Sequence, residues 1–71
     1  MERAIRDDGN AMDIILNGQA RTLDGPATVD DLLGQLKLAP VRVAVEINEE
    51  LVSRKSFAQI ALNNGDRVEV V

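Results

Sequence analysis

The last ten residues of this chain constrain its fold more than any other stretch. An Asn-Asn-Gly-Asp turn precedes a segment in which Val68 and Val70 alternate with Arg67 and Glu69. Because side chains of a strand point alternately to opposite faces, this pattern predicts a terminal strand with one apolar face and one charged face. A terminal strand frays unless its neighbours hold it. We therefore expect this strand to lie between two earlier strands of a sheet.

Composition excludes several classes of function. The chain has 71 residues, no cysteine, no histidine, one aromatic residue and a net charge of −4. One small domain without disulfides, thiolate metal sites or a histidine base is expected. Acidic charge and a lack of stacking aromatics argue against nucleic-acid binding. No apolar run is long enough to span a bilayer, and the start lacks the apolar middle of a signal peptide, so we expect a cytoplasmic protein with no membrane contact.

The first part of the chain predicts a short leader followed by a hairpin. Residues 1–11 mix charges with a Gly-Asn pair and are expected to form a flexible leader, with the folded domain at 12–71. Met12–Leu16 is apolar except for Asp13, and Gln19–Leu23 returns as a second strand. The intervening Asn17-Gly18 favours the left-handed angles of a two-residue hairpin turn.

A helix is predicted after the break at residues 24–27. Thr28 is placed to cap it, with Asp31 in the reciprocal position of a capping box. The following apolar residues recur at helical spacing: Val29, Leu32, Leu33 and Leu36. Pro40 should end the helix near Lys37 or Leu38.

The rest of the chain predicts two more strands and a short helical turn. Residues 41–47 alternate and form the clearest strand, residues 48–50 form a turn, and residues 51–52 begin a short strand. A helical turn at 56–60 is expected, with Ser56 as its cap and Phe57 and Ile60 facing inward. The fold class is α+β: a mixed sheet of about five strands, one main helix across one face, and the last strand parallel to the first. This order is that of the β-grasp, or ubiquitin-like, fold.

No residue is a strong candidate for catalysis. Acidic pairs at 7–8, 30–31 and 49–50 are interpreted as leader, helix-dipole partners and a solvated turn. Ser53 and Ser56 lack a histidine to activate them. We predict no catalytic residue, no metal site and no cofactor.

The exposed face of the sheet is the candidate partner-binding site. If alternate residues of the first, third and last strands face the helix, then Ile15, Ala44 and Val71 face outward side by side. They would form a small apolar patch rimmed by four charged residues: Arg42, Glu46, Arg67 and Glu69. The predicted partner-binding residues are Ile15, Ala44, Arg67, Glu69 and Val71. Ordinary apolar surface is the alternative interpretation.

From Met12 to the end, the sequence resembles the bacterial sulfur-carrier family ThiS. The matching features are the opening strand with its Asn-Gly turn, the Thr-Val-Asp-Asp-Leu-Leu helix start, the hairpin around residues 43–54, and the closing Gly-Asp-Arg-Val-Glu-Val-Val strand. Glu49 stands where the family usually has glycine, and Ser53 where it often has proline. MoaD, the molybdopterin-synthase sulfur carrier, shares the fold and ranks second.

The resemblance implies a protein that is not itself an enzyme and that acts as a carrier in thiamine (thiazole) biosynthesis. In this family a tail ending in Gly-Gly follows the last strand, a ThiF-type enzyme adenylates its carboxylate with ATP, and sulfur transfer gives a thiocarboxylate that a ThiG-type thiazole synthase consumes. This sequence has no Gly-Gly end, so the reactive glycine would lie beyond Val71. Three alternatives stay open: a ThiS/MoaD-like binding module without sulfur-carrier activity, a molybdopterin-synthase carrier, and a fragment of a fusion with another domain.

Overall fold

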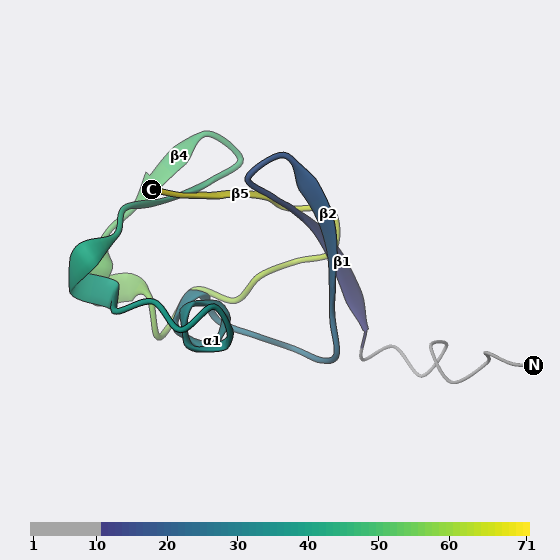
Figure 1. The fold of residues 1–71 in the computed structure, drawn as a ribbon, viewed down its shortest axis with the longest axis horizontal. Coiled ribbons are helices and arrows are strands. Elements are labelled where there is room, and N and C mark those ends of the chain that lie inside the picture. Colours follow the sequence, from purple (N-terminus) through teal and green to yellow (C-terminus); the bar gives the residue numbers. More distant parts are fainter. Residues whose placement is uncertain (1–10) are drawn as a thin grey trace, which may run out of the picture.

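A computed structural model describes residues 11–71 of the chain. The predicted leader, residues 1–11, lies outside the described residues apart from Ala11, and it stays a prediction. Within the described part, five strands form one sheet and α1 lies against one of its faces (Figure 1). The elements in chain order are β1 (Met12–Leu16), β2 (Gln19–Leu23), α1 (Val29–Gln35), η2 (Pro40–Arg42), β3 (Val45–Ile47), β4 (Glu50–Val52), η3 (Arg54–Ser56) and β5 (Arg67–Val70).

The strand order β2-β1-β5-β3-β4 places the last strand in the middle of the sheet. β5 runs parallel to β1 and antiparallel to β3. This mixed arrangement confirms the β-grasp prediction and the expectation that the closing strand needs a neighbour on each side. The alternation that predicted β5 also holds, because Val68 and Val70 are buried while Arg67 and Glu69 are exposed.

The first hairpin forms as predicted because its turn residues accept positive φ. Asn17 and Gly18 have φ of 50° and 83°, and Leu16 pairs with Gln19 across a two-residue turn. Both angles are those of the primed turns that match the twist of a hairpin. The turn therefore fixes the register between β1 and β2.

The helix α1 begins with the predicted capping box. The backbone N–H of Asp31 donates to Thr28 Oγ1 at 3.1 Å, and the backbone N–H of Thr28 donates to Asp31 Oδ2 at 2.9 Å. Two further N–H groups of the first turn donate to the loop after η3: Val29 to the Ile60 carbonyl and Asp30 to the Phe57 carbonyl, both at 3.0 Å. All the amides that a helix start leaves without an intrahelical partner are thus satisfied.

The helix ends at Gln35, about two residues before the predicted end. Lys37 adopts a positive φ of 61°, and the N–H of Leu38 donates back to the Leu33 carbonyl at 2.9 Å. These are the angle and the bond of a Schellman cap, which usually has glycine at this position. The cap, and not Pro40, terminates the helix.

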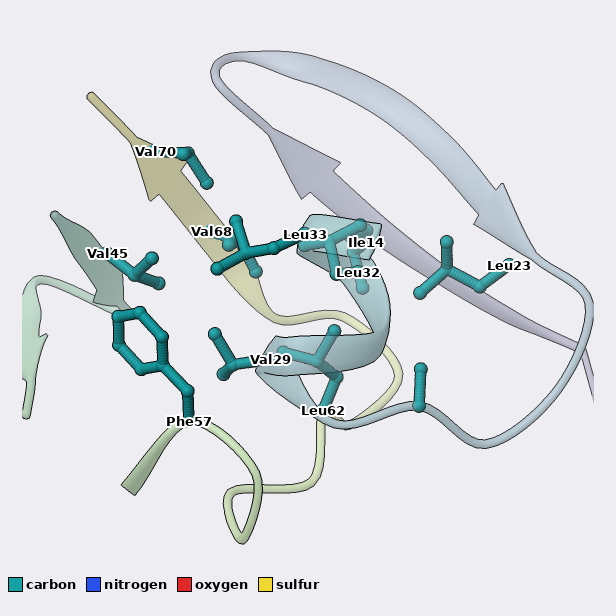
Figure 2. Close-up of a cluster of buried hydrophobic side chains, with 11 residues drawn as sticks. Ile14, Leu23, Val29, Leu32, Leu33, Val45, Phe57, Leu62, Val68 and Val70 are labelled. Carbon is teal, nitrogen blue, oxygen red and sulfur yellow. The ribbon is translucent and has the colours of Figure 1, made fainter. Parts of the chain in front are cut away.

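The core lies between α1 and the sheet, and its buried side chains come from α1, from β1, β2, β3 and β5, and from the loops (Figure 2). The sheet and the helix contribute most of it, and Phe57 and Leu62 close it from the loops. Its buried apolar residues are Ile14, Leu23, Ala27, Val29, Leu32, Leu33, Val45, Phe57, Leu62, Val68 and Val70.

The predicted strand at residues 41–47 is wrong in its first half. Pro40–Arg42 is a short 3-10 helix, and only Val45–Ile47 forms β3. Arg54 holds the 3-10 helix in place, because its Nε donates to the Pro40 carbonyl at 3.1 Å and its Nη2 to the Val41 carbonyl at 3.4 Å. Val41 consequently points into solvent, at 71% exposure.

The helical turn predicted at 56–60 forms, because the N–H groups of Gln59 and Ile60 both donate to the Ser56 carbonyl, at 2.9 and 3.0 Å. A 3-10 helix that was not predicted, η3 (Arg54–Ser56), precedes it. Ser56 belongs to that helix, whose cap position is Ser53, so the predicted cap at Ser56 is wrong. Phe57 is buried as expected, but Ile60 is 37% exposed, so its predicted inward position is wrong. The carbonyls of Phe57 and Ile60 accept the N–H groups of Asp30 and Val29, so the backbone of this turn is tied to the start of α1.

The β3–β4 turn has two residues, one fewer than predicted, and it forces Glu49 into an unfavourable conformation. Asn48 and Glu49 have φ of 52° and 73°, and Glu50 already belongs to β4. Asn tolerates this region, whereas a long side chain is strained there.

We expect Glu49→Gly to stabilise the protein by about 1 kcal/mol, because glycine adopts positive φ without steric cost. Thermal unfolding followed by circular dichroism should then show a midpoint raised by about 4–8 °C. Glu49→Ala is the control, since it removes the carboxylate but keeps a Cβ atom. An equal gain in that variant would assign the effect to charge and contradict the backbone explanation.

Candidate functional site

The outward face of β5 and its neighbours carries the five predicted partner-binding residues. Ile15 on β1 pairs with Arg67, and Glu46 on β3 lies directly opposite Glu69. At the end of the sheet, Ala44 and Val71 exchange two backbone hydrogen bonds of 2.8 and 3.0 Å. Val71 is 84% exposed. The outward side chains thus form rows that run across β5, each row made of residues that pair between neighbouring strands.

The predicted single apolar patch is wrong in one respect, because Ile15 does not lie beside Ala44 and Val71, which do adjoin each other. Ile15 lies in the row of Arg67, while Val71 lies four residues further along β5. At about 3.3 Å per residue that separation is roughly 13 Å. Glu46 and Glu69 occupy the row between them. The cause is the register between β1 and β5, which places Ile15 beside the first residue of β5.

A shallow acidic hollow occupies the part of this face near Ile15. Its volume is about 210 Å³, and its lining residues are Ile15, Gly18, Glu46, Glu49, Arg67 and Glu69. Like charges directly opposite each other across a sheet destabilise it. Glu46, Glu49 and Glu69 outnumber Arg67 among the lining residues, so the net charge of the hollow is negative.

Leu51 belongs to the same face and was missed by sequence reasoning. It is 72% exposed, pairs with Glu46, and lines a second hollow together with Ala44. Val52, its neighbour in β4, packs against the core, so alternation in this short strand turns Leu51 outward. The same alternation in the sequence could have predicted that Leu51 faces outward. Leu51 therefore extends the row of Glu46 and Glu69, while Ala44 and Val71 form the apolar end of the face.

Within residues 11–71, no group of three acidic, histidine or cysteine side chains is arranged to hold a metal ion. Over the same residues, no helix is both long and apolar enough to cross a membrane. Arg42 lies on η2 and not on a strand, so it does not belong to the rows that cross β5.

Comparison with known proteins identifies the family. A model of the ThiS family matches residues 14–71. The sulfur carrier protein ThiS of Escherichia coli is 35% identical over 57 residues, which cover 80% of this chain and 86% of that protein. The crystal structure of the thiamine biosynthesis protein ThiS from Geobacter metallireducens superposes with a TM-score of 0.76 at 36% identity, covering 84% of this chain and 91% of the other.

Similarity extends to part of a larger protein. A thiazole synthase of Paramagnetospirillum magneticum is 43% identical over 60 residues, which are 84% of this chain but 18% of that protein. The chain likewise spans 18% of the length of the thiazole synthase that it matches in Magnetococcus marinus. The family match over residues 14–71, the similarity over 86% of a known ThiS, and the shared fold show that the chain belongs to the ThiS family.

Proposed function

We propose that this protein carries sulfur for thiazole formation in thiamine biosynthesis, as a thiocarboxylate at the end of a tail that follows β5. The observation that carries the proposal is the position of β5. It lies in the centre of the sheet and is paired on both sides, so a segment continuing past Val71 would leave the sheet at a fixed point. Family membership supports the same role.

The proposed chemistry requires activation, because a carboxylate is a poor acceptor of nucleophiles. A carboxylate oxygen of the terminal glycine attacks the α-phosphorus of ATP, and pyrophosphate leaves. Sulfide then attacks the acyl carbon, the bond to the phosphate oxygen breaks, and AMP leaves. Glycines suit this tail because they carry no side chain that would obstruct a narrow site. The carrier itself supplies no catalytic group and acts as the substrate of a ThiF-type adenylating enzyme.

We further propose that the outward face of the sheet contacts the partner enzymes, through Ile15, Ala44, Arg67, Glu69 and Val71, with Leu51 added. This face combines an apolar end with an acidic hollow, the two kinds of surface that give affinity and orientation. Similarity to a segment of two thiazole synthases supports thiazole synthase as one partner. Joining a carrier and its acceptor in one chain would raise their effective concentration.

Replacing Ile15 with aspartate is expected to weaken binding to thiazole synthase at least tenfold, because a carboxylate buried in the interface loses its water. Titration calorimetry would measure the affinity. Gln59→Asp, which adds the same group at an exposed position after η3, should leave the affinity unchanged. Equal affinity of the Ile15 variant and the wild type would show that this face does not dock.

The carrier function is tested by comparing two forms of the chain, one ending at Val71 and one extended by a short tail that ends in Gly-Gly. Each is incubated with a ThiF-type enzyme and ATP, and pyrophosphate release is measured. Release is expected only with the extended form. A failure of the extended form to react would contradict the carrier function, and reaction of the Val71 form would contradict the need for Gly-Gly.

A further inference from the structure

Two asparagines flank β5 in the same structural setting, at its opposite ends. Asn17 and Asn48 are each the first residue of a two-residue hairpin turn, and each has positive φ, 50° and 52°. Each side-chain amide also makes two hydrogen bonds, one to a backbone N–H of β5 and one to an acceptor in or beside that strand. Asn17 bonds Val70 near the end of β5, and Asn48 bonds Asp66 and Arg67 at its start.

The side chain of Asn17 takes the place of β1 backbone beside the end of β5. The backbone of β1 bonds β5 through the N–H of Ile15 to the Asp66 carbonyl and the N–H of Asn17 to the Val68 carbonyl, both at 2.9 Å. Beyond Asn17 the chain turns away into the hairpin. The side chain then continues the pairing: the N–H of Val70 donates to Asn17 Oδ1 at 2.8 Å, and Asn17 Nδ2 donates to the Val70 carbonyl at 3.2 Å.

The edge of β5 that faces β3 is held at Val71, one residue after Val70. Ala44 and Val71 exchange two backbone bonds on the β3 side. Val70 is therefore held from the β1 side and Val71 from the β3 side, so both edges of the strand stay paired to its last residues. Among the residues that the structure describes, only the amide of Asn17 bonds the backbone of Val70 on the β1 side.

We propose that Asn17 is a positioning residue for activation of the carrier: by holding Val70, it fixes where the tail leaves the sheet and hence the direction in which it enters the adenylating site. This inference rests on the proposed carrier function. When Val70 is released, only a fraction of molecules presents an ordered strand end, and the apparent affinity for the enzyme falls by that fraction. Loss of this contact should therefore raise KM for the carrier and leave kcat unchanged.

Asn17→Gly tests the inference, and Asn48→Gly is its matched control. Glycine accepts the positive φ at both turns, so each variant loses two side-chain hydrogen bonds without backbone strain. At Asn48 the lost bonds are those from the Arg67 N–H to Oδ1 and from Nδ2 to Asp66 Oδ1, both 3.0 Å. The control thus loosens the start of β5 and leaves the exit of the tail intact.

Amide hydrogen exchange on the chain itself is the first measurement. The Val70 amide should exchange about tenfold faster in Asn17→Gly, the factor expected from one lost hydrogen bond, with the Arg67 amide unchanged. Asn48→Gly should show the reverse. An unchanged Val70 amide in Asn17→Gly would overturn the inference.

Adenylation kinetics are the second measurement, on chains extended to Gly-Gly, with a ThiF-type enzyme and ATP. We expect Asn17→Gly to raise KM for the carrier about five- to tenfold at unchanged kcat, and Asn48→Gly to leave KM within about twofold of the wild type. Equal KM values for Asn17→Gly and wild type, or an equal rise in both variants, would overturn the positioning role while the carrier function stands. An unreactive wild type would instead overturn the carrier function, and the positioning role with it.

Discussion

Phe57→Ala is expected to remove about 3–5 kcal/mol from the free energy of unfolding. A domain of this size is stabilised by about 4–11 kcal/mol in total, so the variant should lose a large part of its stability. Urea unfolding followed by circular dichroism would measure the loss as a lower midpoint at an unchanged slope.

The size of this effect follows from the position of Phe57. Its ring is 2% exposed and points toward Val45 in the core (Figure 2). Its carbonyl accepts the N–H of Asp30, so the same residue joins the loop after η3 to the start of α1. In a small core, few neighbouring side chains are available to fill the cavity.

Phe57→Leu is the matched control, because it keeps most of the apolar volume, and we expect it to cost about 1–2 kcal/mol. Similar losses in the two variants would show that the ring does not fill the core as described. A loss below about 1 kcal/mol for Phe57→Ala would contradict its place in the core outright.

Asp66→Ala is expected to cost about 3 kcal/mol, because it leaves two donors around a buried carboxylate without a partner. Asp66 is 7% exposed. Its Oδ2 accepts the Asn63 N–H at 2.7 Å, and its Oδ1 accepts Asn48 Nδ2 at 3.0 Å. The side chain thus closes the turn before β5 and ties it to the β3–β4 turn.

Asp66→Asn separates these two contacts. Its remaining oxygen can still accept the Asn63 N–H, but its NH₂ group would face the NH₂ group of Asn48. Asn48 cannot reverse its amide without losing the bond from the Arg67 N–H. We therefore expect a loss of about 1–2 kcal/mol, intermediate between alanine and wild type. Equal stability of the asparagine variant and the wild type in urea unfolding would contradict the described hydrogen bonds.

The parts of the fold that sequence reasoning predicted correctly are those set by local chemistry. The Asn17-Gly18 turn and the capping box of Thr28 and Asp31 depend on residues within three positions of one another. The central place of β5 followed from its alternation and from the order of elements. Each of these signals can be read without knowing what the segment will contact.

The errors arose where a distant contact decides between two local possibilities. Residues 41–43 alternate like a strand, but Pro40–Arg42 forms a 3-10 helix that Arg54 holds from 13 and 14 positions away. The loop after η3 is shaped by the amides at the start of α1. Neither contact leaves a pattern in the nearby sequence.

The candidate site was predicted only in part, again because distant contacts decide the rest. Alternation gave the correct outward direction for Ile15, Ala44 and Val71, but their spacing depends on the register between β1 and β5, which join residues about fifty positions apart. The amide contacts of Asn17 with Val70 span 53 positions. The turn alone accounts for an asparagine at position 17, so nothing in the sequence indicated that its side chain also bonds Val70.

The carrier function is tested most directly by the intact mass of the chain extended to Gly-Gly, after incubation with ATP, a ThiF-type enzyme and sulfide. The account predicts a product in which one oxygen of the terminal carboxylate is replaced by sulfur, and the return of the original mass when thiazole synthase and its other substrates are added. An unchanged mass under conditions that convert the ThiS of Escherichia coli would contradict it.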